Sequence, residues 1–206
     1  RVCREAITPG VRMTLLDPTF PMSERFAVQC GGRVDRVAWM DGDFPIEAVI
    51  ESGRNATVVA LVTPNNPTGL VISIEAIRRA ELPDTLLVID LAYAEFATSD
   101  PGPMLRDLPG TVVIRTLSKA WGLAGIRVGW IESSPVIASK LRAAGGPYPV
   151  SSFSLEIASR TLCDPTSEAA MSDRVGRIRT NRDRMNDWLD RRGIERKPSE
   201  GNFILF

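Results

Sequence analysis

Residues 57–69 read TVVALVTPNNPTG, in which five successive apolar residues lead directly into a loop rich in proline and asparagine. An apolar run without the alternation of a half-exposed strand is typical of a strand that is covered on both faces. Asn-Pro and Thr-Gly favour turns, so we expect the strand to end at Val62. The stretch therefore predicts a buried strand whose carboxyl end carries a polar loop.

Short runs rich in valine, isoleucine and leucine recur along the chain, at Val11–Leu16, Val34–Trp39, Thr85–Ile89, Thr111–Arg115 and Ile126–Ile131. Between the runs lie segments with a helical pattern, such as Ile46–Glu51 and Ser73–Glu81. Strands that alternate with helices predict an α/β fold with a mostly parallel sheet.

The pattern changes after Tyr148, where Ser152–Leu162 and Pro165–Arg192 are predicted to be helical. One face of the second helix carries apolar residues: Met171, Val175, Ile178, Met185, Trp188 and Leu189. The arginines and aspartates between them are most simply interpreted as a solvated face. The closing residues GNFILF (201–206) predict the opening of another strand, and RVCREAITPG (1–10) resembles the tail of a helix. We therefore expect the chain to be an internal portion of a longer protein.

Composition excludes several classes of function. The chain has 206 residues, 25 Lys and Arg against 25 Asp and Glu, and no histidine. Balanced charge argues against a nucleic-acid or anionic-membrane partner, and the absence of histidine excludes a Ser-His-Asp mechanism within this chain. Three separated cysteines argue against a zinc site and a disulfide framework. With no signal peptide and no apolar run long enough to span a bilayer, we expect a cytoplasmic protein.

Four polar or aromatic clusters follow predicted strands: DPTF (17–20), TPNNPTG (63–69), DLAY (90–93) and TLSK (116–119). Ligands of open α/β sheets bind outside the carboxyl ends of the strands. Asn66 precedes Asp90 by 24 residues and Asp90 precedes Lys119 by 29, and each interval fits one strand–crossover–strand repeat. The four clusters are therefore expected to converge on one crevice.

Lys119 is one of only three lysines in a chain with 22 arginines. A primary amine can lose its proton and attack a carbonyl, whereas a guanidinium effectively never deprotonates. This contrast suggests a Schiff base. Asp90 closes a buried strand, where a carboxylate is costly unless a cation or hydrogen bonds compensate it. A protonated pyridine nitrogen would do so, although an isolated aspartate at a strand end more often caps a loop.

Thr116, Ser118 and Arg127 flank a turn with glycines at 122, 125 and 129. Hydroxyls and a guanidinium suit a phosphate dianion. The alternative is that the glycines only form turns and that Arg127 makes a surface ion pair.

Three further residues belong to these clusters. Asn66 lies in a motif that alone indicates a turn, and Phe20 would by its residue type more often be core than a stacking platform. Tyr93, one of two tyrosines, follows Asp90 by three residues and could project its hydroxyl into the same crevice.

Together, TPNNPTG, VIDLAYAEF (88–96) and RTLSKAWGLAGIRVGW (115–130), in this order and spacing, resemble the fold-type I pyridoxal-phosphate enzymes of aminotransferase class I/II. The third motif, with DLAYAEF and the later PYPVSS (147–152), is most similar to the histidinol-phosphate aminotransferase branch. The resemblance implies a three-layer α/β/α large domain over residues 1–150, without its N-terminal part. Residues 151–206 would form connecting helices and the start of a small α+β domain.

The resemblance also implies roles for the site residues. Lys119 would form the Schiff base with pyridoxal 5'-phosphate and move the substrate α-proton, and Asp90 would hold the pyridinium proton. The other roles would be contacts to the 3-oxygen of the ring from Tyr93 and Asn66, stacking by Phe20, and phosphate binding by Thr116, Ser118 and Arg127.

The implied activity is amino-group exchange between an amino acid or amino-alcohol phosphate and a 2-oxo acid, in a homodimer. Two alternatives stay open from the sequence. One is a decarboxylase of the threonine-phosphate type, and the other is a truncated, catalytically silent domain.

Overall fold

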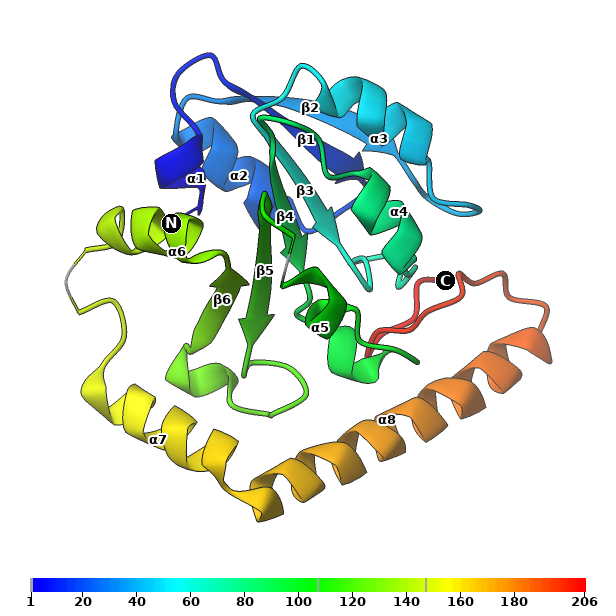
Figure 1. The fold of residues 1–206 in the computed structure, drawn as a ribbon. Helices are drawn as coiled ribbons and strands as arrows, with labels where there is room; N and C mark the ends of the chain where they lie inside the picture. Colours follow the sequence, from blue (N-terminus) through cyan, green and yellow to red (C-terminus); the bar gives the residue numbers. More distant parts are fainter. Residues whose placement is uncertain (1, 107, 147) are drawn as a thin grey trace.

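A computed structural model describes residues 2–106, 108–146 and 148–206. Its centre is a six-stranded sheet in the order β2-β1-β3-β4-β5-β6 (Figure 1). The strands are β1 (Arg12–Asp17), β2 (Arg33–Ala38), β3 (Val58–Val62), β4 (Leu86–Asp90), β5 (Thr111–Thr116) and β6 (Gly129–Ser133). All neighbouring pairs are parallel except β5 and β6, which are antiparallel. The predicted α/β class and the mostly parallel mixed sheet are confirmed.

Helices cover both faces of this sheet (Figure 1). On one face pack α3 (Ile46–Gly53), α4 (Ile74–Arg79) and α5 (Gly102–Leu105), and on the other pack α1 (Val2–Ala6), α2 (Pro21–Gln29) and α6 (Pro135–Ala143). Successive residues of β3 serve opposite faces, with Val59 and Leu61 in one core and Val58 and Ala60 in the other. This explains the continuous apolar runs, because a strand of period 2 that is buried on both sides needs an apolar residue at every position.

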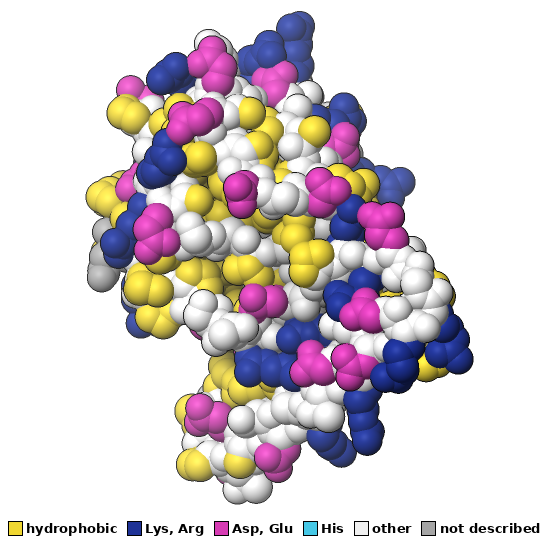
Figure 2. All heavy atoms as spheres, turned by 90° about the vertical axis from the view of Figure 1, so that its right-hand side faces the viewer, with side chains coloured by type: hydrophobic (Ala, Val, Ile, Leu, Met, Phe, Trp, Pro, Cys, Tyr) yellow, Lys and Arg dark blue, Asp and Glu magenta, His cyan; other side chains and the backbone are white. Residues whose placement is uncertain are grey.

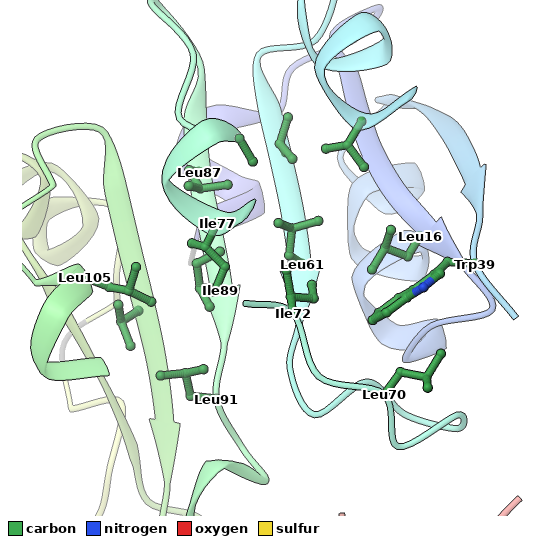
Figure 3. Close-up of a cluster of buried hydrophobic side chains, with 14 of the residues drawn as sticks. Leu16, Trp39, Leu61, Leu70, Ile72, Ile77, Leu87, Ile89, Leu91 and Leu105 are labelled. Atoms are coloured by element: carbon green, nitrogen blue, oxygen red, sulfur yellow. The ribbon is translucent and has the colours of Figure 1, made fainter. Parts of the chain in front are cut away.

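The first core cluster holds the strands to the α3–α5 layer (Figure 3). Leu61 and Ile89 from the strands meet Ile77 of α4, and Leu105 packs from α5; all four are at most 1% exposed. Each such side chain contributes about 1.5–3 kcal/mol on burial. The sheet is therefore a rigid base for the loops at its edges.

Two further helices lie outside the three layers, α7 (Ser152–Cys163) and α8 (Pro165–Asp190). Asp164 caps α8 by accepting hydrogen bonds from the backbone amides of Thr166 and Ser167. The helix passes the carboxyl ends of β3, β4 and β5, next to the C-terminal segment (Figure 1). Within the described ranges, no helix combines the length and the apolar character needed to cross a membrane. Basic and acidic side chains are interspersed over the face in Figure 2.

The structure differs from the sequence prediction at two places. β6 begins at Gly129 rather than Ile126, because Ala124–Ile126 forms the 3₁₀ helix η2 and Arg127 is left-handed, with φ 57°. Residues 201–206 are irregular rather than a strand. Among the described residues no strand lies beside this segment, which instead packs its side chains against α8 and Tyr93. The motif PYPVSS starts at residue 147, which lies outside the described residues.

Candidate active site

The parallel register brings the ends of the central strands to one edge of the sheet. Val62 of β3 pairs with Asp90 of β4, and Asp90 pairs with Ile114 of β5, two residues before the end of that strand. β1 lies on the other side of β3 and ends at Asp17. The loops that contain the four clusters therefore leave the sheet at the same edge.

Tyr93 is the centre of a group of three polar side chains. It precedes the 3₁₀ helix η1 (Ala94–Phe96), and its ring is buried. Asn66 donates a hydrogen bond from Nδ2 to the Tyr93 hydroxyl at 3.1 Å. The Lys119 Nζ lies 5.1 Å from the centre of the Tyr93 ring, which is within the range of a cation–π contact when the amine is protonated. Residues from three different loops thus meet at one phenol.

Asp90 presents a carboxyl group at the end of β4. Its Oδ1 accepts a hydrogen bond from the Ala92 amide at 2.9 Å. Burial raises the pKa of this carboxyl, while the Ala92 amide and the nearby charge of Lys119 act in the opposite direction. Lys119 follows β5, the strand that pairs with β4, and a positive charge there favours the ionised form of Asp90. A cation placed against Asp90 would stabilise its ionised form.

A cavity of about 670 Å³ opens between the sheet, α1 and α2. Asp90 and Phe20 both line it, and Ala60, Val88 and Ile114 form part of its apolar floor. Phe20 precedes α2 and remains 39% exposed. It is therefore not a core residue, and it lines the same cavity as Asp90.

The turn after β5 brings two hydroxyl groups together. Thr116 Oγ1 donates to Ser118 Oγ at 2.9 Å and accepts from the Ser118 amide at 3.1 Å. The turn continues through Lys119, whose carbonyl accepts from the Gly122 amide, and Gly122 has a φ of 71° that favours glycine. The Arg127 guanidinium instead donates to the Ala124 carbonyl at 3.1 Å and is exposed. Thr116 and Ser118 are thus paired, and Arg127 is bonded within its own loop.

Asn65 is a site residue that the sequence interpretation missed. Its buried amide accepts from Thr19 Oγ1 at 2.9 Å and donates to the Pro18 carbonyl at 2.9 Å and to Thr68 Oγ1 at 3.0 Å. It therefore joins the DPTF loop, which carries Phe20, to the TPNNPTG loop. The repeated asparagine in that loop was the available signal, but the turn interpretation did not distinguish the two positions.

The C-terminal segment also reaches the site. The Phe203 ring packs against the Tyr93 ring, and the Glu200 amide donates to the Gly69 carbonyl at 2.9 Å. A side chain at Gly69 would collide with Ser199, because an added Cβ would lie 2.1 Å from the Ser199 Oγ. Glycine at this position lets the two segments touch.

Comparison with known proteins agrees with this geometry. The family model described as aminotransferase class I and II matches residues 2–206. The chain is 31% identical to a histidinol-phosphate aminotransferase of Halalkalibacterium halodurans, over 99% of this chain and 57% of the relative. It is also 36% identical to an aromatic amino acid aminotransferase of Cutibacterium acnes, over 80% of this chain and 47% of the relative.

Solved structures give the same result. The histidinol-phosphate aminotransferase of Sinorhizobium meliloti, solved in complex with pyridoxal-5'-phosphate, superposes with a TM-score of 0.89 at 28% identity. The match covers 98% of this chain and 56% of that one. The chain thus spans a little over half the length of these histidinol-phosphate aminotransferases.

Proposed function

Because the chain belongs to the aminotransferase class I and II family, we propose that it carries the cofactor-binding core of a pyridoxal-phosphate-dependent aminotransferase. The reaction would exchange an amino group between an amino acid or amino-alcohol phosphate, such as a histidinol-phosphate-like donor, and a 2-oxo acid. One observation carries the proposal. The Lys119 amine lies 5.1 Å from the centre of the Tyr93 ring, and Tyr93 follows Asp90, at the end of the strand that pairs with the one before Lys119.

The donor set fits pyridoxal phosphate. Asp90 is a partly buried carboxyl that a protonated ring nitrogen would stabilise, and it lines the same cavity as Phe20. Tyr93 and Asn66 form a hydrogen-bonded pair that can hold a phenolic oxygen. The residues proposed to hold the phosphate are the adjacent hydroxyls of Thr116 and Ser118, together with Arg127.

When bound, the cofactor supplies an aldehyde carbon and an electron-withdrawing ring. This chain supplies the groups that orient it and move protons. The Asp90 carboxylate would keep the ring nitrogen protonated. The Lys119 amine would hold the cofactor in the absence of substrate. Once the substrate amine has displaced it, the free Lys119 amine would accept the proton from the substrate α-carbon and return it as general base and acid.

The larger assembly is part of the same proposal. Residues 1–150 would form the cofactor-binding domain and residues 151–206 the connection to a second domain. We propose a cytoplasmic homodimer, in line with the exposed apolar side chains of α7, where Phe153 is 75% exposed. Leu155 and Leu162 of the same helix are 52% and 46% exposed, and groups of exposed apolar side chains, unlike single ones, mark interfaces.

Titration with pyridoxal phosphate tests the assignment of Lys119. We expect a near-visible absorbance band and, after borohydride reduction, covalent attachment of the cofactor to the peptide that contains Lys119. Lys119→Ala should abolish both signals, whereas Lys140→Ala, at an exposed position of α6, should leave both unchanged. Attachment to Lys140, or no band at saturating cofactor, would contradict the proposal.

A second assay identifies the reaction. Transfer of the amino group from a histidinol-phosphate-like donor to 2-oxoglutarate supports the aminotransferase. With threonine phosphate as the substrate, release of carbon dioxide without transfer of the amino group to 2-oxoglutarate would instead identify a decarboxylase.

A further inference from the structure

Three arginines of α8 donate hydrogen bonds to backbone carbonyls rather than to acids. Arg174 Nη1 donates to the Ala120 carbonyl at 2.8 Å. Arg179 donates to the carbonyls of residues 95, 96 and 97, at 3.2 Å for the first two. Arg182 Nη1 donates to the Gly201 carbonyl at 2.9 Å and to the Phe96 carbonyl at 3.4 Å.

Except for the Gly201 carbonyl, these carbonyls belong to the two turns that carry the reactive groups. Ala120 follows Lys119 in the turn after β5, and residues 95–97 form the end of η1, which begins directly after Tyr93. Val175 of α8 is buried in one cluster with Tyr93, Phe96 and Ala120. A single helix therefore contacts both turns through an apolar centre and guanidinium groups on either side of it.

Guanidinium groups are suited to holding the carbonyls at the end of a short helix. The last carbonyls of a short helix have no partners within the helix, and the planar guanidinium presents several donors in a fixed arrangement. Arg179 engages three successive carbonyls at once, which fixes the end of η1 in position and orientation. Arg174 donates one hydrogen bond, to the Ala120 carbonyl in the turn that holds the amine.

We propose that Arg174 and Arg179 are positioning residues: through α8 they fix the Lys119 turn relative to the Tyr93 turn, so that the amine stays over the phenol ring. Neither guanidinium binds Lys119 or Tyr93 directly. The role in cofactor binding rests on the proposed function, but the fixing of the two turns does not.

Hydrogen–deuterium exchange of the cofactor-free protein tests the fixing of the turns. Arg179→Ala should accelerate exchange of the amides of residues 94–97, and Arg174→Ala that of residues 120–123. Each acceleration should be about tenfold, as expected when a charge-assisted hydrogen bond is lost. Arg177→Ala is the matched control, because Arg177 is exposed on the same helix and donates to neither of these described turns.

Absorbance of the bound cofactor gives the second measurement. In Arg179→Ala the pH midpoint of the band should shift, since Tyr93 would no longer be held against Lys119, and Arg179→Lys should restore part of the parent value. Arg177→Ala should keep the parent midpoint.

The outcomes separate the two proposals. Unchanged exchange in both turns of folded Arg174→Ala and Arg179→Ala variants, or acceleration equal to that in Arg177→Ala, overturns the inference. Should Arg179→Ala not fold, Arg179→Lys carries the same exchange test, with a smaller acceleration expected at residues 94–97. If the parent protein binds no pyridoxal phosphate, the proposed function fails while the exchange pattern still decides whether α8 fixes the turns.

Discussion

The Phe203 ring meets the Tyr93 ring edge to face, with ring centres 5.0 Å apart and planes at 88°. Tyr93 is thus held from three directions, by Phe203, by the amide of Asn66 and by the amine of Lys119. Edge-to-face pairs add about 0.5–1.5 kcal/mol to the burial of the rings. The C-terminal segment therefore helps to orient the phenol at the centre of the site.

Phe203→Ala should destabilise the protein by about 1–3 kcal/mol, because it removes the edge contact and leaves a partly open gap beside Tyr93. It should also weaken binding of pyridoxal phosphate. Urea denaturation and absorbance titration measure the two effects. Phe206→Ala, at a ring that is 75% exposed, serves as the control and should change stability by no more than about 0.5 kcal/mol.

Asp90→Asn should stabilise the cofactor-free protein at neutral pH while weakening the cofactor complex by about 2–5 kcal/mol. Burial raises the pKa of the Asp90 carboxyl, so the folded state holds this proton more tightly than the unfolded state. As the pH rises from the unfolded to the folded pKa, the parent loses stability, and above both values the loss is constant.

The asparagine variant lacks this loss. Urea denaturation at pH 4 and pH 7 should therefore show the gap between variant and parent widening with pH. Asp43→Asn, at an exposed loop position, should show no such widening. A parent that gains stability relative to Asp90→Asn at pH 7 would contradict the prediction.

Arg115→Met should destabilise the protein by about 1.5–3 kcal/mol, as expected when a hydrogen bond to a charged group is lost, because the Asp100 side chain is 38% exposed and the pair is only partly buried. The Arg115 side chain is 8% exposed, donates to both Asp100 oxygens at 2.7 and 2.8 Å, and lies 4.0 Å from Glu95 and 3.9 Å from Glu132. Arg115 lowers the pKa of Glu95 against the larger opposing effect of burial.

Without Arg115 the pKa of Glu95 should rise further, so the destabilisation should be smaller at pH 5 than at pH 7.5. Denaturation curves of the parent and of Arg115→Met at the two pH values measure this difference in destabilisation. Arg106→Met is the comparison, because Arg106 is 56% exposed and lies 3.4 Å from Glu132. This variant should lose no more than about 1 kcal/mol. Equal losses in both variants would show that burial of Arg115 is unimportant.

Asn65→Ala should mainly reduce stability, whereas Asn66→Ala should mainly change the absorbance of the bound cofactor, although the two residues are adjacent in one motif. Asn65→Ala removes a fully buried amide and its three hydrogen bonds and should cost about 2–4 kcal/mol of stability. Asn66→Ala breaks the bond to the Tyr93 hydroxyl and should cost about 1 kcal/mol, while shifting the pH midpoint of the cofactor absorbance. Thermal denaturation and spectral titration of both variants provide the test. A larger loss of stability in Asn66→Ala than in Asn65→Ala would contradict the prediction.

The strands, and the end of the sheet where the loops of the candidate site meet, were predictable from local sequence patterns. β3 and β4 are buried on both faces, so almost every position is apolar, and parallel pairing then places Val62, Asp90 and the loops beyond them at one edge. β6 was placed too early because the left-handed backbone at Arg127 depends on the turn around it and not on the residue type.

The contacts between distant segments were not predictable from local patterns. The interpretation of the charged face of α8 as solvated was wrong for Arg174 and Arg179, whose guanidiniums bind carbonyls 54 and 82–84 residues away. Asn65 and Phe203 were missed for the same reason, since a turn motif and a short apolar run give no indication of their tertiary partners.

In the parallel part of the sheet, the loops at the amino ends of the strands lie opposite the candidate site, so insertions there should leave the site unchanged. The connections into β3, β4 and β5 lie at these amino ends, where Asp84 is exposed and left-handed, with φ 59°, and this edge carries none of the proposed site residues. Reporter peptides or affinity tags inserted at residues 83–84 would therefore leave Asn66, Tyr93 and Lys119 in place, which makes this turn the natural attachment point for immobilising the protein.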